Sequence, residues 1–227
     1  MKKIGMLVAV TREMRAVFAR YGRTVAEETR CGVKLLTYDM GAYQLIVAGS
    51  GAGEIAAAAA CALLIDRYEV ELVVNFGVVG GLTEEMTRTK TCVIERVVHY
   101  DFDTSACDGT LPGQYCEYPD VYLPATPALV RRALEIAPEL KAVTCASGDK
   151  FVEGRERKSA LRDQFGADIC EMEAAAVVLT CNRSEVPCLL IKTVADALSD
   201  GAEDFNTAVQ HSAEHCLAVA DKIIREL

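Results

Sequence analysis

The chain has 227 residues, enough to bury one sizeable hydrophobic core, and it carries 24 Lys plus Arg against 33 Asp plus Glu. The resulting formal charge of −9 argues against nucleic acid as the main partner, because phosphate binding needs a basic face, but it allows a small nucleoside. No apolar run approaches the roughly 20 residues of a membrane span. We therefore expect a single domain over 1–227 without a membrane segment.

Ten cysteines are scattered along the chain, and no two have the Cys-x-x-Cys spacing of a zinc site. Met1 is followed by two lysines and a short apolar run, which does not resemble a secretory signal. We expect reduced thiols, packed as small hydrophobic side chains in a cytoplasmic protein. No metal and no cofactor is expected.

Strands and helices are predicted to alternate along the chain. An apolar strand comes first, and the helix after it has Met14, Val17 and Phe18 at helical spacing. The stretch at 99–127 is predicted to be irregular, which is often a functional feature. The alternation predicts an α/β fold with a central mixed, largely parallel twisted sheet flanked by helices. In chain order we expect a strand at 4–10, a helix at 11–21, strands at 34–38 and 43–48, a helix at 53–65, strands at 72–76 and 91–98, a helix at 127–136, a strand at 142–146, a helix at 155–165, a strand at 167–170, a helix at 173–181, a strand at 188–194 and a helix at 205–227.

Acidic residues follow the first and the last of these strands. Glu13 lies in the first turn of a helix, where an acid also complements the helix dipole. Asp196 ends a strongly apolar run and is equally suited to cap the next turn. Because strand ends in α/β sheets converge on one crevice, both carboxylates are also candidates for a site there. Burial would raise the pKa of a carboxyl group, which a general acid needs.

Two further segments offer binding groups after predicted strands. Glu171, Met172 and Glu173 precede an alanine-rich helix, where an acid caps the helix or binds a sugar diol through its two oxygens. Phe151 is interpreted as a core residue or as a ring that stacks on a flat heterocycle, with the Val152 backbone at the edge of that heterocycle. The strand ends together predict one binding crevice.

Glycine-rich segments follow two strands, at 49–53 and 77–81. The first lacks the Lys-Ser/Thr ending of a P-loop and does not follow the first strand, as a dinucleotide fingerprint would. Tight turns and close approach of the backbone to a ligand are the remaining interpretations.

Seven segments stand in a characteristic order over nearly the whole chain. They are Glu13, 49–53, 75–81, 99–103, 147–151, 171–174 and the pair Ala195-Asp196. In this order they resemble the nucleoside phosphorylase/nucleosidase superfamily, and most closely its 5′-methylthioadenosine/S-adenosylhomocysteine nucleosidases.

The resemblance implies hydrolysis of the N-glycosidic bond of 5′-methylthioadenosine and/or S-adenosylhomocysteine, with release of adenine. Glu13 would activate water, Asp196 would protonate N7 of the purine, and Glu173 would bind the ribose hydroxyls. Carboxylates beside the bond would stabilise an oxocarbenium-like transition state. The other implied substrate contacts are Met172, Phe151, Val152, Val78 and Glu171.

Four positions depart from the family pattern. Val78 stands where serine is common, and Val10 where methionine lines the water pocket. Ala195 also replaces a common serine, so that Asp196 loses a possible orienting hydrogen bond. Lys192 replaces an arginine in the last strand. The carboxylates remain, while rate and substrate range stay open.

The resemblance also implies a homodimer in which a loop of the neighbouring subunit closes the 5′ side. Its counterpart here, around Thr104 and Cys107, is less bulky and more polar than usual. The alternatives are therefore a related nucleosidase acting on 5′-deoxyadenosine or futalosine, a nucleoside phosphorylase, and a non-catalytic nucleoside-binding protein. Phosphorolysis needs several arginines, yet only Arg12 stands beside Glu13, which favours water as the nucleophile.

Overall fold

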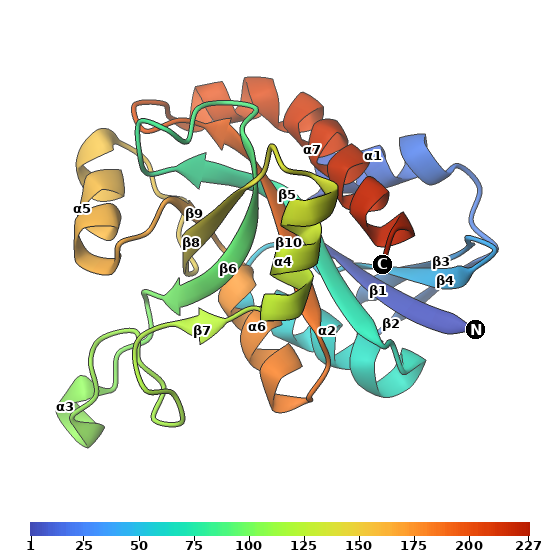
Figure 1. The fold of residues 1–227 in the computed structure, drawn as a ribbon, viewed down its shortest axis with the longest axis horizontal. Coiled ribbons are helices and arrows are strands. Elements are labelled where there is room, and N and C mark those ends of the chain that lie inside the picture. Colours follow the sequence, from blue (N-terminus) through green and yellow to red (C-terminus); the bar gives the residue numbers. More distant parts are fainter.

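The computed structural model describes residues 1–227, and all strands belong to one sheet (Figure 1). The strands are β1 (Lys2–Val8), β2 (Ala26–Arg30), β3 (Val33–Asp39), β4 (Tyr43–Gly49), β5 (Leu72–Gly81), β6 (Thr91–His99), β7 (Leu123–Pro124), β8 (Lys141–Ser147), β9 (Ile169–Glu171) and β10 (Cys188–Asp196). The helices are α1 (Thr11–Tyr21), α2 (Glu54–Tyr68), α3 (Ser105–Asp108), α4 (Pro127–Ile136), α5 (Arg155–Phe165), α6 (Ala174–Arg183) and α7 (Ala202–Arg225). The strand order is β10-β6-β8-β9-β5-β1-β4-β3-β2, with β7 paired to β6.

Parallel and antiparallel pairings are equally frequent in this sheet. β1 runs parallel to β4 and β5, β10 to β5, and β8 to β6 and β9. The remaining five pairings are antiparallel. Because β10 pairs with both β5 and β6 while β9 joins β5 to β8, these strands close into a circuit. The predicted α/β class with a mixed sheet and flanking helices is confirmed, although parallel pairs do not predominate in number.

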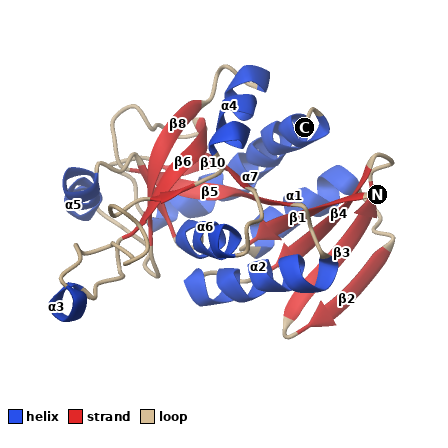
Figure 2. Ribbon diagram, turned by 60° about the horizontal axis from the view of Figure 1, so that its bottom comes forward, coloured by secondary structure: helices blue, strands red, loops and turns tan.

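Helices cover both faces of the sheet (Figure 2). α1 and α7 pack together on one face, and α2 and α6 pack together on the other. α7 buries Val209, Ala213, Cys216 and Ala220, whose spacing places them on one stripe of the helix. Small buried side chains such as Ala57 let α2 pack closely against the neighbouring elements. This two-sided burial explains why the central strands read as almost continuous apolar runs.

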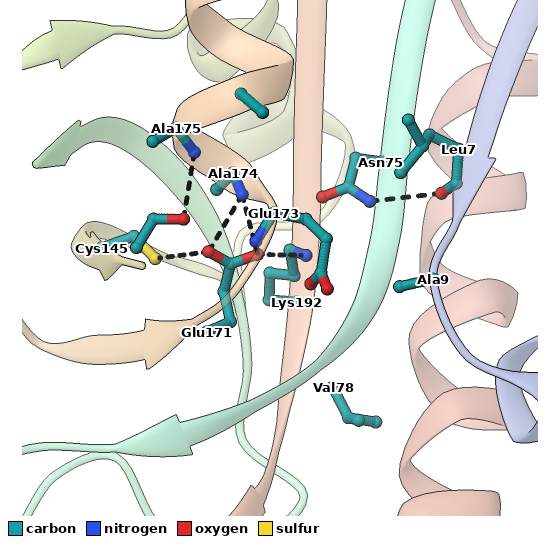
Figure 3. Close-up of polar contacts among 12 residues, drawn as sticks. Leu7, Ala9, Asn75, Val78, Cys145, Glu171, Glu173, Ala174, Ala175 and Lys192 are labelled. Atoms are coloured by element: carbon teal, nitrogen blue, oxygen red, sulfur yellow. Dashed lines mark hydrogen bonds and ion pairs between the residues drawn. The ribbon is translucent and has the colours of Figure 1, made fainter. Parts of the chain in front are cut away.

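β5 is ten residues long and outruns its neighbour β1. The last β1–β5 pair joins Leu7 to Asn75, whose side-chain Nδ2 donates to the Leu7 carbonyl oxygen at 3.2 Å (Figure 3). Beyond this pair β5 continues to Gly81 and pairs with β9. The carboxyl ends of β1 and β5 therefore separate, and the candidate site lies at this separation.

Helix ends were easier to predict than strand ends. α1, α4 and α5 begin and end at the predicted residues. The strand expected at 72–76 extends to Gly81, because its glycines continue to pair with β10 and β9. β2 is absent from the predicted elements, since Ala26–Arg30 is a polar, largely exposed edge strand without apolar alternation. The irregular stretch at 99–127 holds only the one-turn α3 and the two-residue β7.

All ten cysteines are free thiols. Seven of them are buried, as expected for small hydrophobic side chains, whereas Cys31, Cys107 and Cys116 are exposed. None of the helices has both the length and the apolar character that a membrane crossing requires.

Candidate active site

A cavity opens at the carboxyl ends of β1, β5, β9 and β10. It has sixteen lining residues, ten of them hydrophobic, so that a few polar groups project into an apolar space. All eight residues predicted from the sequence to form the site line this cavity. They are Glu13, Val78, Phe151, Val152, Glu171, Met172, Glu173 and Asp196.

Glu13 links its own helix to β5. The backbone N–H groups of Ala9 and Val10 donate to Oε2 at 3.2 and 3.1 Å, and that of Val78 donates to Oε1 at 2.9 Å. A Cβ atom at Gly77 would lie 2.5 Å from Oε1, so that only glycine leaves room for the carboxylate. Both interpretations of Glu13 therefore hold, because it stabilises the helix start and also lines the cavity.

Burial raises the pKa of Glu13, and the positive charge of Lys192 together with the three N–H donors opposes this rise. Only 3% of the Glu13 residue surface is exposed. Val78 needs no hydroxyl for this contact because its backbone amide makes it. The departure from serine at this position thus leaves the Glu13 carboxylate fully held.

Glu171 is occupied by contacts within the protein (Figure 3). Lys192 Nζ lies 3.1 Å from Oε2, and both side chains are almost completely buried. The carboxylate also accepts hydrogen bonds from the backbone N–H groups of Glu173 and Ala174 at the start of α6. These contacts assign Glu171 to capping the helix and to holding Lys192 beneath the cavity.

Glu173 has a different environment although it is only two residues away. Its Oε1 accepts a hydrogen bond from the Gly53 amide at 2.9 Å, and no protein group donates to its Oε2. Burial and then the negative charge of Glu171 raise the pKa of Glu173 to about 8, against the opposing charge of Lys192. One carboxyl oxygen therefore stays free for a ligand.

Lys192 is the central cation of this acidic group. Burial alone would lower its pKa, but the charges of Glu171, Glu173 and Glu13 outweigh burial and raise it. A single ammonium group thus faces three carboxyl groups. The imbalance explains why the pKa of Glu173 stays raised although a cation lies close by.

Asp196 lies at the other end of the cavity and forms a buried ion pair. Lys158 Nζ is 2.6 Å from Oδ2, and the Asp196 and Lys158 side chains are 3% and 0% exposed. Burial raises the pKa of Asp196 to about 6, although the hydrogen bond and charge of Lys158 lower it. In the turn after β10 the Ala197 amide donates to the Asp200 carboxylate and the Asp200 amide to the Ala197 carbonyl oxygen, so that the alternative of Asp196 as the cap of this turn is wrong.

Aromatic side chains form the outer wall. Phe151 is 43% exposed and meets Phe205 edge-on, with ring centroids 5.4 Å apart and an interplanar angle of 72°. Val152 is buried in a small apolar cluster beneath them. Phe151 therefore presents a ring to the cavity, which an ordinary core residue would not do.

Sequence reasoning missed three residues near the site. Lys158 belongs to a highly charged helix and resembles a solvent-exposed lysine, so no sequence signal separates it from its neighbours. The sequence predicts Phe205 only as the first residue of the last helix, which in fact begins at Ala202. Glu54 is buried, accepts hydrogen bonds from the Ser147 hydroxyl and the Ala176 amide, and has a pKa raised to about 7 by burial and Glu171. An acid directly after a glycine-rich loop was the available signal for Glu54.

The described side chains include no group of three or more His, Cys, Asp or Glu arranged to hold a metal ion.

The comparison with known families agrees with this geometry. The model of the phosphorylase superfamily matches residues 3–225. The chain belongs to the phosphorylase superfamily. A 5′-methylthioadenosine/S-adenosylhomocysteine nucleosidase of Shewanella denitrificans is 28% identical over 99% of this chain and 100% of its own length. An aminodeoxyfutalosine nucleosidase of Campylobacter jejuni is also 28% identical and covers 94% of both chains.

Solved structures of the superfamily share the whole fold. A mutant of the futalosine hydrolase of Helicobacter pylori superposes with a TM-score of 0.94 at 28% identity, and each chain is covered completely. The nucleoside phosphorylase-like α/β architecture is thereby confirmed. The predicted enzyme class is confirmed as well, and the chain is an N-glycosyl hydrolase of this superfamily.

Proposed function

We propose that the enzyme hydrolyses adenine nucleosides, with Glu13 activating the attacking water and Asp196 protonating N7 of the base. The observation that carries the proposal is the placement of two buried carboxyl groups in one cavity with unlike surroundings. The Glu13 carboxylate approaches β5 at Gly77 and that of Asp196 approaches it at Gly80. Three residues of strand span roughly 10 Å, which leaves room for a glycosidic bond between the two acids.

Each acid has the surroundings that its role needs. A carboxylate base must be ionised; burial raises the pKa of Glu13, and the charge of Lys192 together with the three N–H donors favours the charged form against that rise. A general acid must hold a proton near working pH, and burial raises the pKa of Asp196 to about 6. Glu173 would bind the ribose diol through its free oxygen, and the carboxyl groups together would stabilise the oxocarbenium-like sugar.

Water is favoured over phosphate as the nucleophile. No arginine lines the cavity, and its only basic lining residue is Lys150, which is largely exposed and paired with Asp101. Phosphorolysis requires cations around the anion. A buried Glu13 carboxylate would repel phosphate from the position that water needs to occupy.

Two substrate classes are supported for the 5′ side. The apolar side chains of Val10, Val78, Met172 and Phe205 suit a thioether, and the Shewanella relative is named for 5′-methylthioadenosine and S-adenosylhomocysteine. The Campylobacter relative, equally similar to this chain, favours aminodeoxyfutalosine as a second candidate. Methylthioadenosine and/or S-adenosylhomocysteine is our first assignment.

Release of free adenine from each nucleoside, measured with and without phosphate, tests this assignment. We expect release from 5′-methylthioadenosine that does not depend on phosphate, and the ranking against S-adenosylhomocysteine, 5′-deoxyadenosine and aminodeoxyfutalosine defines the 5′ pocket. Release only with phosphate would make the protein a phosphorylase. Binding without any turnover, in folded protein, would make it a nucleoside-binding homologue.

We also propose a homodimer built on the face of α2 and α6. Ile55 on α2 is 84% exposed and borders a hollow that includes Glu54, Tyr115 and Leu179. An exposed aliphatic residue beside an apolar hollow is typical of an interface. Light scattering should give twice the 24.5 kDa chain mass, and Ile55→Asp should shift the protein toward the monomer.

A further inference from the structure

Lys158 is a fully buried lysine whose ammonium group is directed at one carboxylate. It lies on α5, and Nζ is 2.6 Å from Oδ2 of Asp196, 2.6 Å from the carbonyl oxygen of Ala197 and 3.5 Å from that of Asp200. An ammonium group has three protons, and these acceptors can take all of them. Lys158 is thus held in one position relative to the acid.

Stability alone gives little reason for such a pair. Removing two charges from water costs several kcal/mol per ion, and apolar side chains of similar volume are often equally stabilising. Lys158 and Phe165 are the two buried residues of α5, and the other charged side chains of the helix are not buried, so that Lys158 is its one charged side chain directed inward. Its partner is also the one carboxyl group at this end of the cavity.

We propose that Lys158 is a positioning residue for the acid step, which holds Oδ2 of Asp196 so that Oδ1 is presented to N7 of the base. No protein group hydrogen-bonds to Oδ1, and Asp196 lines the cavity. Ala195, the residue before the acid, has no hydroxyl to orient it. This inference rests on the proposed function of Asp196 as the proton donor.

The proton balance of the step agrees with this role. The O–H bond of Asp196 breaks as an N–H bond forms at N7, and the electron pair of the broken C1′–N9 bond stays on adenine. Asp196 is left as a carboxylate, and the Lys158 ammonium, which keeps its own protons, stabilises that negative charge. The lysine therefore favours the state in which the proton has been transferred.

Few other charges compete with Lys158 for this carboxylate. Cys170 of β9 packs near it, and Asp200 in the turn before α7 adds a negative charge. Arg88, between β5 and β6, adds a positive charge but is itself held by ion pairs with Asp200 and Asp204. Lys158 is consequently the only cation in contact with the acid.

The same ammonium group also fixes the turn that follows β10. By holding the carbonyl oxygens of Ala197 and Asp200, Lys158 ties α5 to the start of α7, which carries Phe205 of the aromatic wall. α5 in turn follows the segment that contains Phe151. Lys158 therefore connects the placement of the acid to the two rings beside the base.

The test compares Lys158→Met with Lys141→Met in adenine release at several pH values. Lys141 is a matched control, because it also pairs with carboxylates, those of Glu85 and Asp168, but does not line the cavity. We expect Lys158→Met to lower kcat by roughly 10- to 100-fold, the size typical of a disturbed acid–base group, with KM changed by less than about threefold. In the plot of kcat against pH, the alkaline limb is where activity falls because Asp196 loses its proton. In Lys158→Met this limb should move upward by about one pH unit, because loss of the cation raises the pKa of Asp196.

The position of that limb separates positioning from mere structural support. A folded Lys158→Met enzyme with the wild-type limb and kcat would overturn the inference, whereas Lys141→Met is expected to keep both. Turnover that survives in Asp196→Asn would instead refute the proposed acid. If Asp196→Asn loses turnover but Lys158→Met keeps the wild-type alkaline limb, only the role of Lys158 is refuted.

A second variant and a second measurement apply if Lys158→Met does not fold. Lys158→Gln keeps a hydrogen-bond donor without the charge and should show the same upward movement of the limb. In the wild-type protein, the ¹⁵N resonance of the Lys158 ammonium group should respond to pH with a midpoint near 6, and this response should disappear in Asp196→Asn. An ammonium resonance that is insensitive to both changes would contradict the contact.

Discussion

The two ends of the cavity differ in how their charges are balanced. Near Glu13, Glu171 and Glu173, three carboxyl groups share one buried cation, Lys192. Near Asp196, one carboxyl group faces one buried cation. The pKa of Glu173 is accordingly raised to about 8 and that of Asp196 only to about 6, although both groups are buried.

This difference teaches that burial alone does not set the chemistry of an acid. At the crowded end the pKa of Glu173 is raised to about 8 and one of its oxygens stays free for a sugar, while the balanced end holds one acid with a pKa of about 6. A nucleosidase needs both kinds of environment, because the sugar becomes positive while the base requires a proton. Substitutions at the two ends are therefore expected to affect activity and stability differently.

The largest effect is expected from Asp196→Asn at the balanced end. The amide cannot donate an acidic proton to N7, so that kcat should fall by roughly 10²- to 10⁴-fold. In the wild type, activity should decline as pH rises through the pKa of Asp196 at about 6, because the acid loses its proton. Adenine release measures kcat and its pH dependence, and circular dichroism checks that the variant is folded. Wild-type turnover in a folded variant would contradict the role of Asp196.

Glu13→Gln should come next in size. The amide keeps the shape of the side chain but cannot accept a proton from water, and we expect kcat to fall by about 10²- to 10³-fold. A base must be ionised, so wild-type activity should also decline as pH falls through the raised pKa of Glu13. This acidic limb should be missing from the residual activity of Glu13→Gln. Its persistence would assign the limb to another group.

Substitution of Glu173 should affect sugar recognition more than bond cleavage. Glu173→Ala removes the oxygens proposed to bind the ribose diol, and we expect a loss of roughly 10- to 100-fold in kcat/KM for ribosides. The comparison is made between a riboside and its 2′-deoxyriboside. Discrimination that equals that of the wild type would show that the hydroxyl contact lies elsewhere.

The smallest effect is one on stability, at the crowded end. A carboxyl group whose pKa is raised on folding contributes full stability below its unfolded value near 4.5 and loses it as pH rises through about 8. Glu173→Gln is uncharged at every pH, so it should exceed the wild type by about 1 to 3 kcal/mol in unfolding free energy at pH 8. Urea unfolding at pH 5 and pH 8 measures this. An equal difference at both values would exclude the titration of Glu173 as its cause.

The elements that depend on local pattern were predictable. α1, α4 and α5 have amphipathic spacing or a proline at the start, and their ends agree with the sequence. β2 has no such pattern because an exposed edge strand needs no apolar face. Its position is decided by pairing with β3, which is a contact between segments and not a property of the segment itself.

In the candidate site, too, some residues could be predicted from the local sequence and others depend on contacts between distant segments. Glu13, Glu173 and Asp196 could be found from the sequence because acids after apolar strands are uncommon, and the order of segments resembles one superfamily. Lys158 could not be found, since a lysine in a charged helix is ordinarily exposed. Only its packing against the turn after β10 buries it.

The sequence by itself determined the fold class, the superfamily and the acids of the cavity, because these depend on the order of residues along the chain. The tertiary structure decided which acid shares a cation with others and which has its own. It also decided that β5 leaves β1 after Asn75 and so makes room for the cavity. The reason is that electrostatic environment depends on distances between groups such as Lys158 and Asp196, which are 38 residues apart in the chain.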